Sequence, residues 1–229
     1  MQERRIYDRI ADSEAGDSLG KIFRRISRPS RILDVGVGCG ALGQMVQMRG
    51  VGTIDGIDFD RLMLERARPY YQDLFEADID AVDPCLVVGA RRYDVIVVAD
   101  VIEHLRFPSR AVKLLSKLLL DGGKMLFSVP NVTYLGVLCE LASGKFCYRN
   151  EGLLDKTHLR FFSHDSLHEM IADAELMVTH EDTVQMPLSL SEFKDYDPHV
   201  FLNMDRVGSM PHALAYQFIV EAVPVRKGG

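Results

Sequence analysis

Residues Ile32 to Gly43 read "ILDVGVGCGALG". This stretch decides the fold, because a short apolar strand runs directly into a glycine-rich turn. One reading is G-x-G-x-x-G ending at Gly43, the pattern of a dinucleotide-binding turn. The other is D-x-G-x-G-x-G, which starts at Asp34 and continues through Gly36, Gly38 and Gly40. Both readings predict a ligand at the carboxyl end of the first strand, and they differ in which ligand it is.

Outward from this turn, short β-branched and apolar runs alternate with helical patterns. That order is typical of a parallel sheet with helices on both faces. We expect strands at 31–35, 53–58, 73–77, 93–99, 124–129, 176–182 and 215–223. A helix from Pro108 should continue until Asp121, and Ser163 should cap another helix.

The length of 229 residues and the hydrophobic share of 47% predict one α/β domain with a well-buried core. Within residues 1–229 we expect an N-terminal helical segment at 1–30, a core at 31–183 and a final strand at 215–223. The polar segment 187–211 fits no long regular element, which favours a lid over the acceptor. Tyr7 and the lid aromatics Phe193, Tyr196 and Phe201 should close that site.

Charge and hydropathy limit the partners. The chain has 27 Lys and Arg against 33 Asp and Glu, a net charge of −6, which argues against a nucleic-acid footprint. No apolar run reaches the roughly 18 to 20 residues of a membrane span, and no leader opens the sequence. The four cysteines lack metal-site or disulfide spacing. We therefore expect a soluble, cytoplasmic protein.

Asp34 discriminates between the two readings of the turn. A dinucleotide places its pyrophosphate on the helix N-terminus, where a neighbouring carboxylate would oppose it. S-adenosylmethionine has no phosphate and carries an ammonium and a sulfonium, so an acidic neighbour favours it. Asp58, 22 residues beyond Gly36, does not discriminate, because both cofactor types use an acid there to bind ribose. Alternatively, Asp58 caps the helix that starts at Asp60.

Six segments carry a family resemblance: "ILDVGVGCG" (32–40), "GIDFD" (56–60), "ADID" (77–80), "YDVIVVADVIEHL" (93–105), "LLLDGGKMLFSVPN" (118–131) and "GLLDKTHLRFFSHDSLHEMIADAEL" (152–176). In order and spacing the first five resemble class I S-adenosylmethionine-dependent methyltransferases. The last is similar to the ubiquinone-methyltransferase-like group, often encoded with or fused to bacterial glycosyltransferases. The resemblance implies a doubly wound, Rossmann-like α/β fold, a seven-stranded sheet in order 3-2-1-4-5-7-6 with the last strand antiparallel.

The resemblance also implies site roles. Asp34 and Gly36 would hold the methionine end of the cofactor and Asp58 its ribose. Phe59 would flank the adenine, Asp78 and Ile79 would meet its amine, and Asp100 would lie beside the methyl group.

Two histidines are candidates for a general base that would assist transfer to a hydroxyl. His104 follows the fourth strand, and His158 lies in the polar run "DKTHLR" with Asp155 and Arg160, which we assign to acceptor binding. Alternatively, His104 packs at a helix start and the polar run is a hydrogen-bonded bracket. A third reading rests on a resemblance: Asp100, Glu103 and His104 form a D-x-x-E-H run similar to the E-x-x-E-H run that binds a divalent cation in ubiquinone-type and small-RNA 2′-O-methyltransferases. His158 would be a fourth ligand. We do not favour this reading.

The sequence therefore predicts methyl transfer to a small hydroxylated acceptor, such as a sugar or glycan precursor, in a bacterial pathway. The chain would act alone or as one module of a glycosyltransferase-associated system. Two alternatives stay open: a catalytically silent S-adenosylmethionine-binding partner subunit, and a nicotinamide-dependent oxidoreductase.

Overall fold

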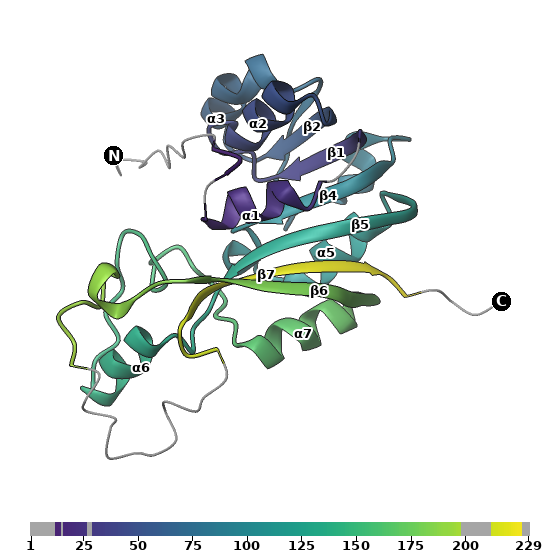
Figure 1. Ribbon diagram of the computed structural model, residues 1–229. Coiled ribbons are helices and arrows are strands. Elements are labelled where there is room, and N and C mark those ends of the chain that lie inside the picture. Colours follow the sequence, from purple (N-terminus) through teal and green to yellow (C-terminus); the bar gives the residue numbers. More distant parts are fainter. Residues whose placement is uncertain (1–11, 15, 27–28, 198–211, 226–229) are drawn as a thin grey trace.

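A computed structural model describes residues 12–14, 16–26, 29–197 and 212–225. Its centre is one seven-stranded sheet in the order β3-β2-β1-β4-β5-β7-β6 (Figure 1). The strands are β1 (Ser30–Val35), β2 (Gly52–Asp58), β3 (Leu74–Glu76), β4 (Tyr93–Ala99), β5 (Leu119–Pro130), β6 (Leu176–Gln185) and β7 (Ala215–Pro224). β7 runs antiparallel to both of its neighbours, β5 and β6, and the other strand pairs are parallel. The predicted fold class and strand order are confirmed.

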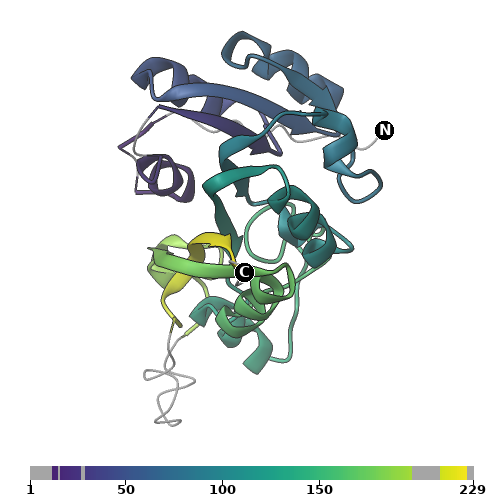
Figure 2. The ribbon, with the colours of Figure 1, turned by 90° about the vertical axis from the view of Figure 1, so that its right-hand side faces the viewer.

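Helices cover both faces of the sheet, as Figure 2 shows from the side. The α-helices are α1 (Ser18–Arg24), α2 (Ala41–Arg49), α3 (Arg61–Ala67), α4 (Pro84–Val88), α5 (Pro108–Ser116), α6 (Leu135–Ala142) and α7 (His164–Asp173). Short 3₁₀ turns are η1 (Arg68–Tyr70), η2 (Ile102–His104) and η3 (Leu188–Leu190). Apolar residues of α1 and α2 form one core against the sheet, and those of α5 and α7 form a second core against its other face.

The α5–β5 connection differs from the sequence prediction. The helix ends at Ser116 and not at Asp121, and β5 already begins at Leu119. The pairing of β4 with β5 then shifts register after Tyr93, so the Asp-Gly-Gly run is an irregular part of the strand. Gly123 passes so close to the β4 backbone that a Cβ there would lie 3.1 Å from the Tyr93 carbonyl oxygen. The glycines therefore serve a bulged strand and do not stop a helix.

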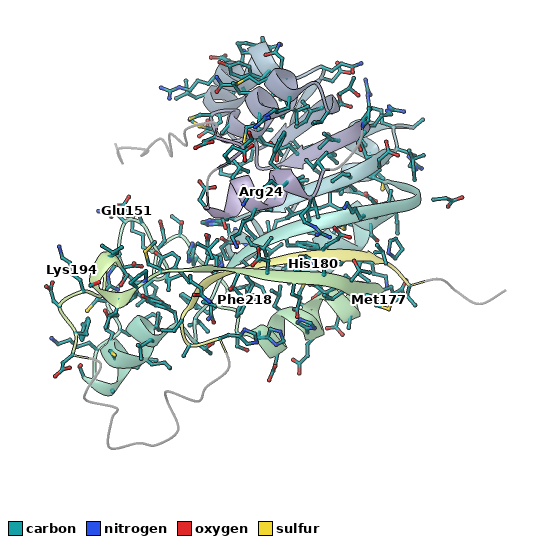
Figure 3. The ribbon with its side chains drawn as sticks, in the orientation of Figure 1. Arg24, Glu151, Met177, His180, Lys194 and Phe218 are labelled. Carbon is teal, nitrogen blue, oxygen red and sulfur yellow. The ribbon has the colours of Figure 1, made fainter. Side chains whose placement is uncertain are left out.

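Residues 132–161 and 186–197 form an extension beside the sheet, on the left in Figure 1. Its apolar cluster contains Tyr134, Val137, Leu153, Leu154 and Phe193. Glu151 and Lys194, from its two segments, both lie in this part of the molecule (Figure 3). Phe193 is fully buried, and a Cβ on Gly136 would lie 2.5 Å from its ring.

The first part of the expected lid is therefore packed scaffold. Phe193 is wrong as an acceptor-facing aromatic, because its ring lies inside this cluster. Tyr196 packs against the same cluster and is half-buried. Phe201 and Tyr7 lie outside the described residues. Within the part of the chain that the structure describes, none of the helices has the length and apolarity needed to cross a membrane.

Candidate active site

The glycine-rich turn joins β1 to α2, and its backbone explains the glycines. Gly36, Gly38 and Gly40 have φ values of 79°, 50° and 89°, which side-chain-bearing residues rarely adopt. A Cβ at Gly36 would lie 2.6 Å from the Val101 side chain, and one at Gly40 would lie 2.9 Å from the Ala67 backbone. At Gly38, by contrast, no described residue other than its two chain neighbours comes within 4 Å of that position. The space above Gly38 therefore fits the close approach of a bound cofactor.

Asp34 is buried near the end of β1, where its carboxylate has a partner that the sequence did not indicate. The Tyr71 hydroxyl donates a hydrogen bond to Asp34 Oδ2 at 2.6 Å and accepts one from the Gly43 amide at 3.2 Å. Burial, and then the Asp34 charge, raises the pKa of Tyr71 well above its usual range, so it stays a donor. A Cβ at Gly43 would lie 2.3 Å from the Tyr71 ring. Gly43, the last glycine of G-x-G-x-x-G, is therefore required because the Tyr71 ring occupies the space that a side chain would need.

Asp58 closes the other side of the turn, at the end of β2. Its Oδ2 accepts a hydrogen bond from the Gly38 amide at 3.3 Å, and its Oδ1 accepts one from the Asp60 amide at 2.8 Å. Burial raises the pKa of Asp58. The side chain that caps α3 is that of Asp60, which accepts from the Leu62 amide at 2.9 Å. The alternative in which Asp58 caps this helix is therefore wrong. Phe59 follows and is 70% exposed beside the turn.

Asp78 and Ile79 follow β3 on the same edge of the sheet. Asp78 is exposed, and its Oδ1 accepts a hydrogen bond from the Asp80 amide at 2.9 Å. The Ile79 side chain belongs to the main core. Asp80, in turn, accepts from the Arg106 amide at 2.7 Å and so ties this turn to the loop after β4.

Asp100 comes directly after β4 in a left-handed conformation, with φ at 55°. Its Oδ1 accepts hydrogen bonds from Ser128 Oγ at 2.8 Å and from Gln217 Nε2 at 2.9 Å. Ser128 lies on β5 and Gln217 on β7. The strained backbone and the two donors fix the carboxylate where three strands meet. Neither donor could be assigned from local sequence.

His104 and His158 lie side by side, with ring centroids 4.9 Å apart and planes at 73°. His158 Nδ1 is 3.1 Å from the Leu153 carbonyl oxygen. A carbonyl only accepts, so this nitrogen carries the proton and Nε2 keeps its lone pair. Burial, and then the neighbouring His104, lowers the pKa of His158. The pair therefore presents a neutral imidazole nitrogen.

The run around His158 also forms the bracket that the sequence allowed as an alternative. Asp155 is buried, and its Oδ1 accepts from the Thr157 amide and hydroxyl, each at 2.7 Å. The Arg160 amide donates to the Glu103 carbonyl at 3.0 Å, and its Nη2 donates to the Arg106 carbonyl at 2.7 Å. Asp155 thus has an internal role in place of the expected acceptor contact. The Arg160 side chain is exposed at the loop surface.

The structure groups different residues from those of the D-x-x-E-H run in the cation reading. Among the described residues, Glu103, His104 and His158 have ligand atoms within 4.8 Å of one another, and Asp100 is outside this group. Asp100 instead receives its hydrogen bonds from β5 and β7. The structure therefore brings together three of the four residues of this reading and leaves out Asp100.

Comparison with known proteins gives a consistent result. Residues 7–181 match a family model described as a methyltransferase domain. The ubiquinone biosynthesis O-methyltransferase of Nitrosococcus oceani is 32% identical over 149 residues, 64% of this chain and 59% of that protein. The protein of the same name from Coxiella burnetii is 26% identical over 119 residues, 51% of this chain and 50% of that protein. The chain thus spans about half the length of the curated relatives it matches.

Solved structures share the fold at low identity. Magnesium protoporphyrin IX methyltransferase from Synechocystis, with bound S-adenosylhomocysteine, has a TM-score of 0.59 and 13% identity, covering 90% of this chain and 83% of that one. An S-adenosylmethionine-dependent methyltransferase from Clostridium acetobutylicum has a TM-score of 0.61 and 11% identity, covering 96% and 94%. With the family match over most of its length, the chain belongs to the class I S-adenosylmethionine-dependent methyltransferases.

Proposed function

We propose that this chain transfers a methyl group from S-adenosylmethionine to a hydroxyl oxygen of a small molecule, with His158 as the general base. The observation that carries this proposal is the hydrogen bond from His158 Nδ1 to the Leu153 carbonyl. It fixes the tautomer and directs the lone pair to Nε2, and the lowered pKa keeps that nitrogen unprotonated near neutral pH.

The turn supplies a cofactor site that fits this group. Asp34 and Gly36 would hold the methionine end, and the Asp58 carboxylate would accept from the ribose hydroxyls. Exposed Phe59 would flank the adenine, while Asp78 and the main chain of Ile79 would meet its amine. When bound, S-adenosylmethionine supplies an electrophilic methyl group on a sulfonium, a leaving group that needs no acid.

The residues of the chain then act on the acceptor. Positioning two reactants can contribute about 7 to 11 kcal/mol, and a general base a further factor of roughly 10² to 10⁴. His158 takes the hydroxyl proton. Burial, and then His104, lowers the pKa of His158. The hydrogen bond to the Leu153 carbonyl raises this pKa, as do the charges of Asp155 and Asp100.

The acceptor is the finer part of the proposal. The relatives named for ubiquinone biosynthesis are O-methyltransferases, which supports oxygen as the acceptor atom. We propose that the acceptor is a sugar or glycan precursor of a bacterial pathway. This proposal rests on the resemblance of the sequence to the glycosyltransferase-associated group. Arg160 would pair with a phosphate or carboxylate of that acceptor, and Tyr7 would contribute to the same site. The net charge of −6 favours such a small molecule over nucleic acid.

Release of S-adenosylhomocysteine tests the proposal, with nucleotide sugars, phenols and amines as acceptors. In His158→Gln we expect kcat to fall by about 10² or more while cofactor affinity is unchanged. His180→Gln is the matched control, because His180 is an exposed residue of β6. Full activity of His158→Gln, or methylation on nitrogen, would overturn the base assignment.

Two further results would redirect the proposal. Cofactor binding without turnover of any acceptor would support the silent partner subunit, and binding of NADH in its place would support an oxidoreductase. Glu103, His104 and His158 are also ligand types for a divalent cation. The assay is therefore repeated after chelation. Loss of turnover that added Mn²⁺ or Zn²⁺ restores would support a bound cation at these residues.

A further inference from the structure

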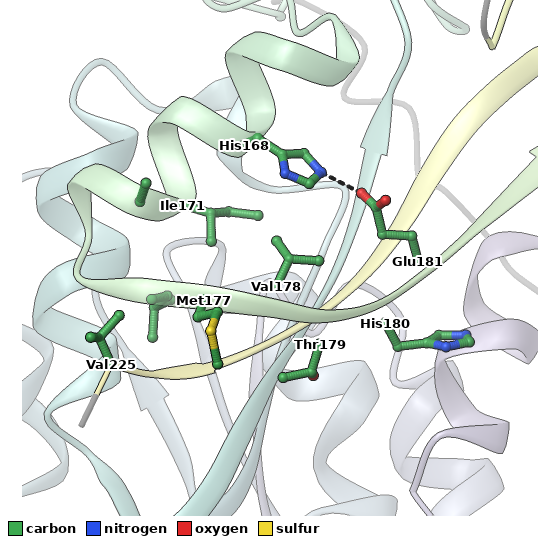
Figure 4. A pocket seen from close by; sticks show the side chains of 10 residues that line it. His168, Ile171, Met177, Val178, Thr179, His180, Glu181 and Val225 are labelled. Carbon is green, nitrogen blue, oxygen red and sulfur yellow. Dashed lines mark hydrogen bonds and ion pairs between the residues drawn. The ribbon is translucent and has the colours of Figure 1, made fainter.

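A second cluster of histidines lies at the outer edge of the sheet, apart from the cofactor turn and from His104 and His158. His164 and His168 on α7 both direct their Nε2 atoms at one oxygen, Oε1 of Glu181 on β6. The His164 distance is 3.2 Å, and His168 makes the hydrogen bond drawn in Figure 4. The ligand atoms of all three residues lie within 4.8 Å of one another.

The helix places both imidazoles on one side. A capping box between Ser163 and Ser166 starts α7 immediately before His164. The next turn brings His168 to the same face, because residues four apart on a helix are neighbours. The two rings are 4.4 Å apart between centroids. This spacing gives two nitrogen donors on a rigid element.

A bulge in β6 aims the carboxylate at the helix. The pairing of β6 with β7 shifts between Val178 and His180, so Thr179 is an extra residue in the strand. Glu181 consequently pairs with Val220, whose side chain belongs to the core that α7 covers. Without the extra residue, His180 would take this place, because a shift of one residue exchanges the two faces of a strand. In Figure 4 the His180 side chain points away from His168 and Glu181.

Neighbouring groups hold the His164 ring. Its Nδ1 is 3.3 Å from Asp165 Oδ1, which leaves Nε2 as the atom facing Glu181. The His212 ring stacks on it at 4.3 Å and 11°, and Phe218 contacts it edge-on at 5.7 Å. A carboxylate on the second nitrogen of an imidazole is a common partner of a metal-binding histidine.

Exposure decides how an ion could reach the cluster. The side chains of His164, His168 and Glu181 are 29%, 35% and 39% exposed, so the group opens to solvent and leaves room for a bound water. Two imidazole nitrogens and one carboxylate oxygen are ligands of Zn²⁺ and related transition ions, whereas Mg²⁺ and Ca²⁺ prefer all-oxygen sites.

We propose that His164, His168 and Glu181 bind one Zn²⁺ ion that clamps α7 to the edge strand β6. Water completes the coordination, and His212 and Asp165 position the His164 ring. The ion would replace the hydrogen bonds that now converge on Glu181. This site is independent of the proposed methyl transfer, since none of its residues belongs to the cofactor turn or the His104–His158 pair.

Zinc titration of the chelator-treated full chain tests the proposal, by calorimetry and by the visible absorption of substituted Co²⁺. We expect one ion bound in the wild type. In His168→Ala and Glu181→Gln we expect affinity to fall by more than about 100-fold, beyond the 10- to 100-fold typical of losing an outer partner. His180→Ala is the matched control from the same strand and should bind as the wild type.

The other histidine group provides the critical comparison. His104→Ala should keep the ion if the proposal holds. Wild-type affinity in His168→Ala, or loss of the ion only in His104→Ala, would overturn it. Binding of S-adenosylhomocysteine and circular dichroism are measured on every variant, so that a folding defect is recognised. If His168→Ala does not fold, the zinc affinity of Glu181→Gln decides the test, because glutamine preserves the shape of the glutamate side chain.

Discussion

Replacing Asp58 with asparagine separates cofactor binding from the stability of the turn. The amide keeps the shape of the carboxylate and retains one oxygen, which can accept from the amide of Gly38 or Asp60. It removes the negative charge that we assign to the ribose. A hydrogen bond to a charged group contributes about 1.5 to 3 kcal/mol. We therefore expect the dissociation constant of S-adenosylhomocysteine to rise about 10- to 150-fold.

Isothermal titration with S-adenosylhomocysteine measures this change, and circular dichroism reports whether the fold is retained. Asp60→Asn is the matched control, because it is the same chemical change two residues away. Asparagine caps helices as well as aspartate does, so α3 should keep its cap from the Leu62 amide. An unchanged dissociation constant in Asp58→Asn would refute the ribose role. An equal loss in both variants would show that a disturbed turn is the cause.

Two further predictions concern base strength and stability. In His104→Gln the acidic limb of the kcat profile against pH should move to higher pH. Burial still lowers the pKa of His158, but the neighbouring imidazole no longer lowers it further, so the pKa rises. A limb that stays in place would contradict the coupling between the two histidines. Glu140→Gln should lower the free energy of unfolding by about 3 to 5 kcal/mol. Buried Glu140 pairs with Arg149, and the largely buried guanidinium of Arg149 would lose its charged partner. Urea denaturation followed by circular dichroism measures this, with exposed Glu169→Gln as the control; equal midpoints would refute it.

The sheet could be predicted because its information is local. The run 95–99 is apolar throughout, and β4 is the central strand buried on both faces. Where the pattern is ambiguous, the prediction failed. Leu119 satisfies a helical stripe and a strand equally well, and only its pairing with Tyr93 assigns it to β5. The third apolar cluster was missed for the same reason, since Phe193 meets Tyr134 only in the folded chain.

In the candidate site, too, features with a local sequence signal could be predicted, and contacts between distant segments could not. Asp34, Asp58 and Asp100 could be found because acids at the ends of parallel strands meet at one edge of the sheet. Their hydrogen-bond partners could not, because Tyr71 and Gln217 come from distant segments. The histidine cluster was also missed. His164 and His168 have recognisable helical spacing, but the direction of Glu181 depends on a bulge that no residue type announces.

The hydrogen bond from Gln217 to Asp100 has a consequence for the order in which the protein becomes functional. It joins residues 117 positions apart, and β7 inserts between β5 and β6, which are both made earlier. During synthesis the cofactor turn emerges first, yet the sheet keeps a gap beside β5 until β7 has left the ribosome. Long-range pairing of this kind is slow and leaves strand edges open to misassembly. A nascent chain should therefore present a complete glycine turn well before Asp100 is held in place, and methyl transfer should begin only when the last strand closes the sheet.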